Sequence, residues 1–152
     1  MQPETTRRGT HYALTELGPP ESWGRFMTQV GAPPGIRAPG KAFLAEALHM
    51  TGMEISANVM RPGGAVPFLH RHRRHEETYV ILSGRGEMQI DGEIIALHPG
   101  SVVCIKPDGE RCWRNTGVEP MHYLVIQAEV DSLEKATIED GFMSSQTVRW
   151  PA

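Results

Sequence analysis

Between Met53 and Val130 short apolar runs alternate with turn-forming residues, and this alternation restricts the fold of the chain more than any other feature. The runs are short for helices, and Gly, Pro, Asn or Asp separate most of them. In order they read EISANVM, PFLHRH, ETYVIL, EMQI, EIIAL, SVVCI, CWRN and MHYLVIQAEV. About eight strands at this spacing predict an all-β fold, an antiparallel sandwich or barrel rather than a parallel sheet.

One turn in this region is specified by two residues. Asp91-Gly92 stands directly between EMQI and EIIAL. A two-residue hairpin turn requires positive φ at both central positions, and Asp-Gly is a preferred pair for it. We therefore expect a tight hairpin at residues 91–92.

The first 52 residues have a different texture and are expected to form an N-terminal arm with one helix, packed on the barrel. Half of the 12 prolines lie in the first 40 residues, which favours irregular structure. The segment 41–50, KAFLAEALHM, has the apolar spacing of a short helix that Gly52 could end. Three aromatic side chains are candidates for clamping the arm to the body: Trp23, Phe26 and Tyr12.

Residues 131–152 form the last part of the chain. Asp131 followed by Glu134 is a capping-box pattern, which predicts one short helix. The remaining tail is expected to be anchored by Phe142 or Trp150. Together with the arm at 1–52 and the barrel at 53–130, this makes a single domain, as 152 residues suggest.

Composition excludes several classes of protein. A net charge of −3 argues against a protein that coats nucleic acid. The chain contains no apolar run long enough to span a membrane and no secretory signal at its start. Two cysteines, Cys104 and Cys112, make a disulfide framework implausible, so a reducing cytoplasm is the expected location.

The chemistry of the chain is concentrated in the segment HRHRRHEE, where three of the seven histidines lie within six residues. Residues two apart on a strand point to the same side, so His70 and His72 share a face. Glu77 is the first residue of the next expected strand that would point toward these two histidines. Two imidazoles and one carboxylate converging in a barrel suit a divalent transition metal with open coordination positions. Alternatively, the segment is a solvated hairpin in which arginines pair with Glu76 and Glu77.

The spacing Gly64-x5-His70-x-His72-x4-Glu77-x6-Gly84 resembles the first motif of the cupin superfamily. The second cupin motif corresponds in length to Gly100 through Asn115, but its interior departs at three positions, which hold Lys106, Asp108 and Arg111. The likeness covers about residues 53–130. A closer likeness joins the chain to a group of uncharacterised single-domain bacterial cupins through FLxEALxxTGMEIS, WRN and IQA.

The resemblance implies a jelly-roll β-barrel whose metal ligands are His70, His72 and Glu77, with Fe, Mn, Ni or Zn as the metal. Arg111 stands where cupins usually have the third histidine, and a guanidinium is not a metal ligand. Arg111 can pair with Glu77 and compete with metal, or it can hold an anionic group of a substrate. A register shifted by one residue would instead place Cys112 at this position, but it requires a deletion before Asn115.

Several other residues are weaker candidates. Tyr79, Trp113 and Gln127 are expected to line the cavity and to contact substrate. His122 has the opposite strand parity to Gln127, so only one of them can face the cavity, and we favour Gln127. Three residues are expected outside the site: His75 at the surface, Glu76 facing away from Glu77, and His98 in a turn.

Two functions remain open on the sequence. The first is a metal-dependent enzyme, an oxygenase or isomerase, acting on a small anionic organic molecule that Arg111 orients. The second is a metal-free module that binds a small ligand, with Arg111 paired to Glu77. Neither requires a nucleic acid or a membrane, and a homodimer is expected in both cases.

Overall fold

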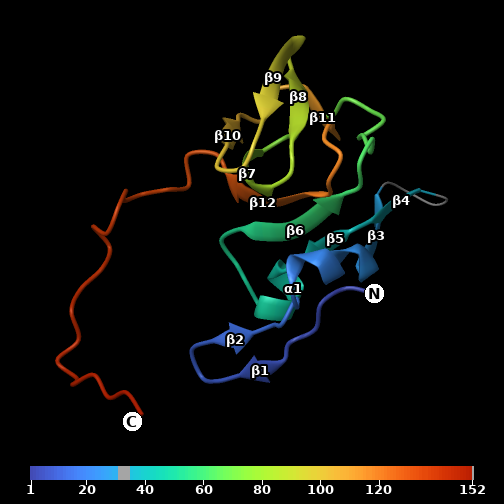
Figure 1. Cartoon of the computed structure of the whole chain (residues 1–152). Coiled ribbons are helices and arrows are strands. Elements are labelled where there is room, and N and C mark those ends of the chain that lie inside the picture. The colour runs from blue at the N-terminus through green and yellow to red at the C-terminus, as the bar shows by residue number, and fades with distance from the viewer. Residues whose placement is uncertain (31–34, 152) are drawn as a thin grey trace.

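Two antiparallel sheets form the body of the computed structural model, which describes residues 1–30 and 35–151. The larger sheet has the strand order β10-β7-β12-β6-β5 and the smaller one β11-β8-β9 (Figure 1). The strands of the larger sheet are β5 (Lys41–Phe43), β6 (Glu54–Met60), β7 (His75–Ser83), β10 (Val102–Ile105) and β12 (Met121–Glu129). Those of the smaller sheet are β8 (Gly86–Ile90), β9 (Glu93–Leu97) and β11 (Arg111–Asn115). The predicted antiparallel all-β fold is confirmed.

The hairpin between β8 and β9 has the expected geometry. Asp91 has φ 50° and Gly92 has φ 90°, and Ile90 pairs with Glu93 across the turn. Asp91 also accepts a hydrogen bond through Oδ1 from the backbone N–H of Glu110, at 2.9 Å. The turn therefore holds the start of β11 as well as joining β8 to β9.

The larger sheet has an apolar cluster on each face. The first cluster consists of side chains that meet inside the fold: Tyr79, Ile81, Met88, Leu97, Ile105, Met121, Tyr123 and Val125. The second lies on the opposite face, where the N-terminal arm covers β5 and β6: Trp23, Phe26, Ala42 and Ala57. Alternate residues of β5 and β6 thus face opposite sides of the sheet, as period-two side-chain geometry requires.

The N-terminal arm is held by two of the three aromatic residues expected to hold it. Trp23 and Phe26 are buried, whereas Tyr12 is 51% exposed, so the expectation for Tyr12 was wrong. The arm contains β1 (Arg7–Arg8), β2 (Ala13–Leu14), a 3-10 helix η1 (Pro20–Arg25), β3 (Met27–Val30) and β4 (Ile36–Pro39).

The helix expected at 41–50 is mostly absent. Lys41–Phe43 forms β5, which pairs with β6 and buries Ala42 opposite Ala57, so the main sheet extends back across the expected boundary at 52/53. Only α1 (Ala45–Leu48) is helical, and it ends at His49, with φ 54°, rather than at Gly52. Pairing with a strand that is distant in sequence has overridden the local helical spacing.

The run at residues 67–72 is not a regular strand, contrary to expectation. Two isolated bridges, Ala65 with Arg114 and His70 with Arg111, join this stretch to β11. Between them Pro67 has no N–H to donate, which prevents a continuous ladder. The segment nevertheless runs alongside β11 and carries His70 and His72.

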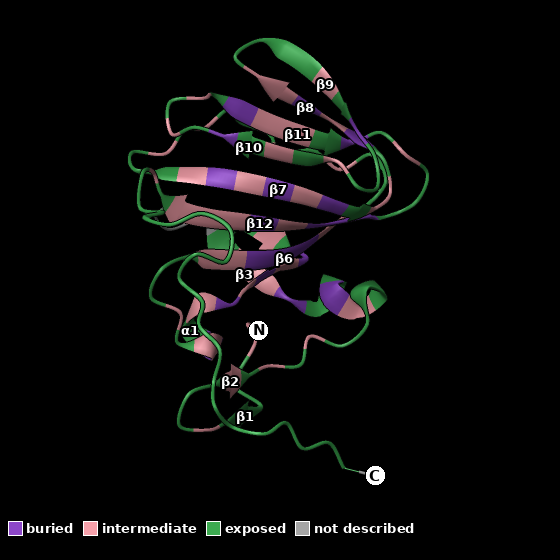
Figure 2. Cartoon of the chain, turned by 90° about the vertical axis from the view of Figure 1, so that its left-hand side faces the viewer, coloured by how far each residue is buried: buried purple, intermediate pink, exposed green. Residues whose placement is uncertain are grey.

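The C-terminal helix is also absent, which corrects the capping-box prediction. Asp131 has φ 60°, which an N-cap residue does not adopt, and residues 131–151 contain no helix or strand. Phe142 is 95% and Trp150 86% exposed, so neither anchors the tail, and Figure 2 shows this segment running away from the sheets. No helix within the described residues is long and apolar enough to cross a membrane.

Candidate functional site

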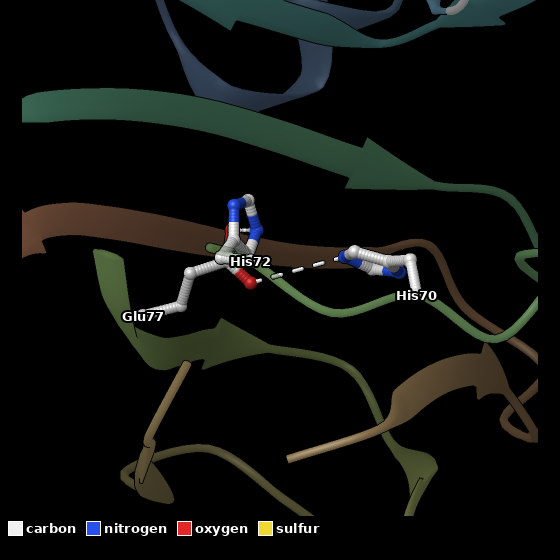
Figure 3. A group of neighbouring side chains, drawn as sticks. All are labelled: His70, His72 and Glu77. Atoms are coloured by element: carbon white, nitrogen blue, oxygen red, sulfur yellow. Dashed lines mark ion pairs between the residues drawn. The ribbon is translucent and has the colours of Figure 1, made fainter. Parts of the chain in front are cut away.

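His70, His72 and Glu77 lie together between the two sheets. One ligand atom from each lies within 4.8 Å of the others. His72 Nε2 is 3.1 Å from Glu77 Oε1, and His70 Nε2 is 3.9 Å from Glu77 Oε2 (Figure 3). Backbone bonds fix the segment that carries the two histidines, since His70 exchanges two with Arg111 and the N–H of His72 donates to Pro107. The convergence expected from strand parity is therefore present, although the histidines stand on an irregular segment.

The two imidazoles are in the state that metal binding requires. Burial lowers the pKa of both His70 and His72, and the charge of Arg111 lowers them further, so both rings are neutral at physiological pH. His70 Nδ1 has no hydrogen-bond partner among the described residues, and His72 Nε2 faces the carboxylate oxygen Glu77 Oε1 at 3.1 Å. Both side chains are about a quarter exposed, at 26% and 24%, so an ion or a small ligand can reach them. This donor set fits a divalent transition metal.

Glu77 is almost fully buried and densely hydrogen-bonded. Its Oε2 accepts hydrogen bonds from Tyr79 Oη at 2.6 Å and from Arg111 Nη2 at 2.7 Å and Nε at 3.1 Å. Its Oε1 accepts one from Gln127 Nε2 at 2.8 Å. Burial alone would raise the pKa of Glu77, but the hydrogen bonds from Tyr79 and Arg111 and nearby positive charge hold it below its usual range. Glu77 is thus an ionised carboxylate that keeps only Oε1 available for a metal.

Arg111 is enclosed, and four of its five N–H donors are hydrogen-bonded. Its exposed fraction is 0%, and Nη1 donates to the backbone oxygens of Gly109 and Pro107, at 2.8 and 3.5 Å. Of the two outcomes left open by the sequence, the structure shows the pair with Glu77. Cys112 follows Arg111 on β11, is only partly buried, and does not belong to the cluster of possible ligands.

Other residues singled out in the sequence are divided between the site and the surface. Trp113 stacks edge-on against Tyr79 at 5.0 Å, lies 5.9 Å from the His70 ring, and donates to Tyr123 Oη at 2.9 Å. Gln127 donates to Glu77 Oε1 at 2.8 Å, and the expected contacts of Gln127, Tyr79 and Trp113 with substrate stay predictions. His122 instead contacts Trp23 on the opposite face of the sheet.

The expected surface residues lie outside the cluster. His75 is exposed, Glu76 pairs with Lys106, and His98 sits at the turn before β10.

One residue of the site was missed at the sequence level. The Lys41 ammonium lies on the inner side of β5 and donates to Ser56 Oγ at 3.0 Å and Asn58 Oδ1 at 3.1 Å. Burial lowers the pKa of Lys41 to about 8. The alternation of Lys41 and Phe43 around the buried Ala42 was the available signal, but it was hidden within a helical pattern.

Comparisons with known proteins agree with this fold. The model of the cupin domain family matches residues 58–127. A cupin protein from Bacteroides fragilis is 36% identical and has a TM-score of 0.66, and the match covers 78% of this chain and 97% of that one. A putative sugar phosphate isomerase from Acidithiobacillus ferrooxidans is 26% identical with a TM-score of 0.54, and the match covers 60% and 59% of the two chains.

A curated relative extends the comparison to an archaeon. An uncharacterized protein of Methanocaldococcus jannaschii is 35% identical over 68 residues, which is 45% of this chain and 54% of that protein. The match thus spans about half the length of that relative. By its jelly-roll sheets, its first motif and its likeness to the Bacteroides protein along nearly all of that chain, this protein belongs to the cupin family.

Proposed function

We propose that the chain binds a divalent transition metal, Fe, Mn, Ni or Zn, through His70, His72 and Glu77, together with a small anionic organic molecule. The observation that carries this proposal is the convergence of two neutral imidazoles on an ionised carboxylate, with His70 Nδ1 unpartnered among the described residues and His72 Nε2 3.1 Å from Glu77 Oε1. Neutral imidazole and carboxylate are the protonation states that bind such metals. Three protein ligands leave positions free for a substrate.

The remaining residues of the site would position Glu77 rather than bind the metal. Tyr79 and Arg111 occupy Oε2 and Gln127 holds Oε1, so the carboxylate has one orientation. Because burial raises the pKa of Tyr79, its hydroxyl stays protonated and continues to donate. A bound metal would supply a Lewis acid that polarises a carbonyl or hydroxyl oxygen of the substrate.

Between an isomerase and an oxygenase, we favour the isomerase. The Acidithiobacillus relative is described as a putative sugar phosphate isomerase, and its identity to this chain is high enough to support more than the fold. A phosphorylated sugar has the anionic group and the carbonyl that the proposed site would use. Fold alone would not distinguish the two reactions, since one fold supports many chemistries.

Metal analysis tests the proposal directly. Protein purified without a histidine tag should take up about one equivalent of metal on reconstitution. The double variant His70→Ala, His72→Ala should lose this uptake, whereas His75→Ala, which removes a neighbouring surface histidine, should keep it. The proposed metal site is contradicted if the metal content stays substoichiometric after reconstitution and is the same in the double variant.

A second candidate function rests on the Arg111–Glu77 pair. Glu77 Oε2 already accepts three hydrogen bonds, which compete with a metal for this oxygen. The chain can therefore be a metal-free module that binds a small ligand at the same site. The variant Arg111→His separates the two functions, because a third imidazole should raise metal affinity if the natural site is only weakened. If Arg111→His also takes up no metal, the ligand-binding function is supported.

Assembly and location stay predictions. We expect a homodimer, and Val102, 64% exposed on the outer face of β10, offers apolar surface that a second copy could cover. Light scattering should give twice the chain mass of 16.8 kDa, and a single-chain mass would contradict the dimer. The expected cytoplasmic location can be checked by fractionating the source cells.

A further inference from the structure

Lys41 is a mostly buried cation without an acidic partner. None of the ion pairs among the described residues includes it. Its ammonium donates only to the neutral oxygens of Ser56 and Asn58 and lies 4.8 Å from the centre of the Phe43 ring. A buried charge normally has a counter-ion, because leaving water without one is costly.

The carboxylates that act on Lys41 are committed elsewhere. Glu77 on β7 and Glu54 on β6 act on Lys41 through space to raise its pKa, but neither forms an ion pair with it. Glu77 is neutralised by Arg111, and Glu54 Oε1 accepts hydrogen bonds from the backbone N–H groups of Leu44 and Ala45. Neither is free to become the missing partner.

The surroundings of Lys41 hold it in place. Asn58 and Ser56 are 2% and 1% exposed, and Asn58 Nδ2 donates to Ser56 Oγ and to the backbone oxygens of Ser56 and Tyr123. An ammonium has three N–H donors, and two are used, so one remains without an acceptor atom among residues 1–30 and 35–151. This is a rigid donor site that is one acceptor short.

Lys41 lies on the side of the larger sheet that faces the histidines. It pairs with Asn58, which pairs with Tyr123 of the interior cluster that also contains Tyr79. Its charge is one of those that lower the pKa of His70, after burial and Arg111. Arg111, the other cation of the site, has no exposed surface, and four of its five N–H donors bind Glu77 and the backbone oxygens of Gly109 and Pro107. Lys41 keeps some exposed surface, so of these two cations it is the one open to a ligand beside His70 and His72.

We propose that Lys41, rather than Arg111, binds the anionic group of the ligand, an oxyanion such as a phosphate, a sulfate or a carboxylate carried by a small organic molecule. This inference rests on the proposed function for the existence of the ligand. The oxyanion completes the hydrogen bonding of the ammonium and supplies the missing counter-ion, while the rest of the ligand reaches toward His70 and His72.

The chain allows a direct test, because it contains only three lysines, Lys41, Lys106 and Lys135. Protein labelled with carbon-13 at the lysine ε position gives three NMR signals, and Lys106 and Lys135 are exposed internal controls. Sodium sulfate is the probe, because its charge does not change near neutral pH. Metal-free protein is used, so the result does not depend on whether the metal site exists.

Sulfate should shift the Lys41 signal in a saturable way and should raise the pKa of Lys41, because an anion stabilises the charged amine. Binding should weaken as the pH rises above about 8, where Lys41 loses its proton. Tyr123 on β12 does not interfere, because burial raises its pKa to about 12. A Lys41 signal that is unmoved by sulfate, or that moves no more than those of Lys106 and Lys135, overturns the proposal.

A pair of variants adds a thermodynamic test. Lys41→Met should weaken sulfate binding about tenfold or more, as loss of a charge-assisted hydrogen bond implies, whereas Lys106→Met should leave it unchanged. Equal affinities in the two variants overturn the proposal. If Lys41→Met does not fold, the NMR titration of the natural protein decides alone. Failure of metal uptake with sulfate bound at Lys41 would contradict only the metal site.

Discussion

The site contains two inward-facing cations that the fold treats in opposite ways. Arg111, on the smaller sheet, has no exposed surface and donates twice to Glu77. Lys41, at the edge of the larger sheet, is held by neutral oxygens and has no carboxylate partner within the described part of the chain. Removing one member of a buried ion pair strongly destabilises a protein, because the other charge is left without a partner. A buried charge that has no partner in the natural protein already opposes folding. The comparison separates a cation that maintains the site from one available to a ligand.

The largest expected effect comes from breaking the Arg111 side of the comparison. Arg111→Met leaves the buried carboxylate of Glu77 without its counter-ion, which should lower the free energy of unfolding by about 3–5 kcal/mol. Urea denaturation followed by circular dichroism measures it. Arg114→Met is the matched control, because Arg114 pairs with Glu87 at the surface and should cost less than about 1 kcal/mol.

A double variant checks the cause of that loss. In Arg111→Met, Glu77→Met both charges are gone, so the protein should recover part of the stability lost in Arg111→Met. A double variant that is less stable by the sum of the two single losses would show that Arg111 acts through packing, and the contrast with Lys41 would then disappear.

A smaller effect is expected from Tyr79, which tests whether Arg111 alone can maintain Glu77. Tyr79→Phe removes the 2.6 Å hydrogen bond to Glu77 Oε2 and keeps the ring against Trp113. A hydrogen bond to a charged group implies a loss of about 2 kcal/mol. Thermal or urea unfolding measures it, with Tyr12→Phe on the exposed arm as control. A loss no greater than that of Tyr12→Phe would mean that the guanidinium suffices.

The sequence predicted the part of the site that depends on short-range geometry. His70 and His72 are two residues apart, so they share a side even though their segment is an irregular strand broken at Pro67. Arg111 was identified by the spacing of the second motif, but spacing could not tell whether it would pair or bind substrate. The pair forms at a carboxylate that Tyr79 and Gln127 also bind, from β7 and β12, and these strand-to-strand contacts cannot be read from spacing.

The part that could not be predicted depends on contacts distant in sequence. KAFLAEALHM has helical spacing, yet Lys41–Phe43 pairs with β6 because this buries Ala42 against Ala57. The helix expected at 41–50 concealed the inward position of Lys41 on β5. The capping-box pattern at Asp131 failed for a related reason, since the following residues are exposed and have no core to stabilise a helix.

The smallest effect concerns Lys41 and is visible mainly through pH. The folded-state pKa of Lys41, about 8, lies below its ordinary value of 10.5, so between these values the unfolded chain binds the proton more tightly. As the pH rises from about 8 to 10.5, the natural protein should therefore gain stability relative to Lys41→Met. The gain should be about 1 kcal/mol, because Lys41 is partly exposed and solvent screens its charge. At neutral pH the two should differ little, because relief of the buried charge is offset by the lost donor to Asn58. Urea unfolding across the window, with Lys106→Met as control, measures the change. If Lys41→Met instead lowers the free energy of unfolding by several kcal/mol at every pH, Lys41 is a paired structural cation like Arg111. Removing a charge is that costly, at a pH where the group does not titrate, only when the charge has a partner.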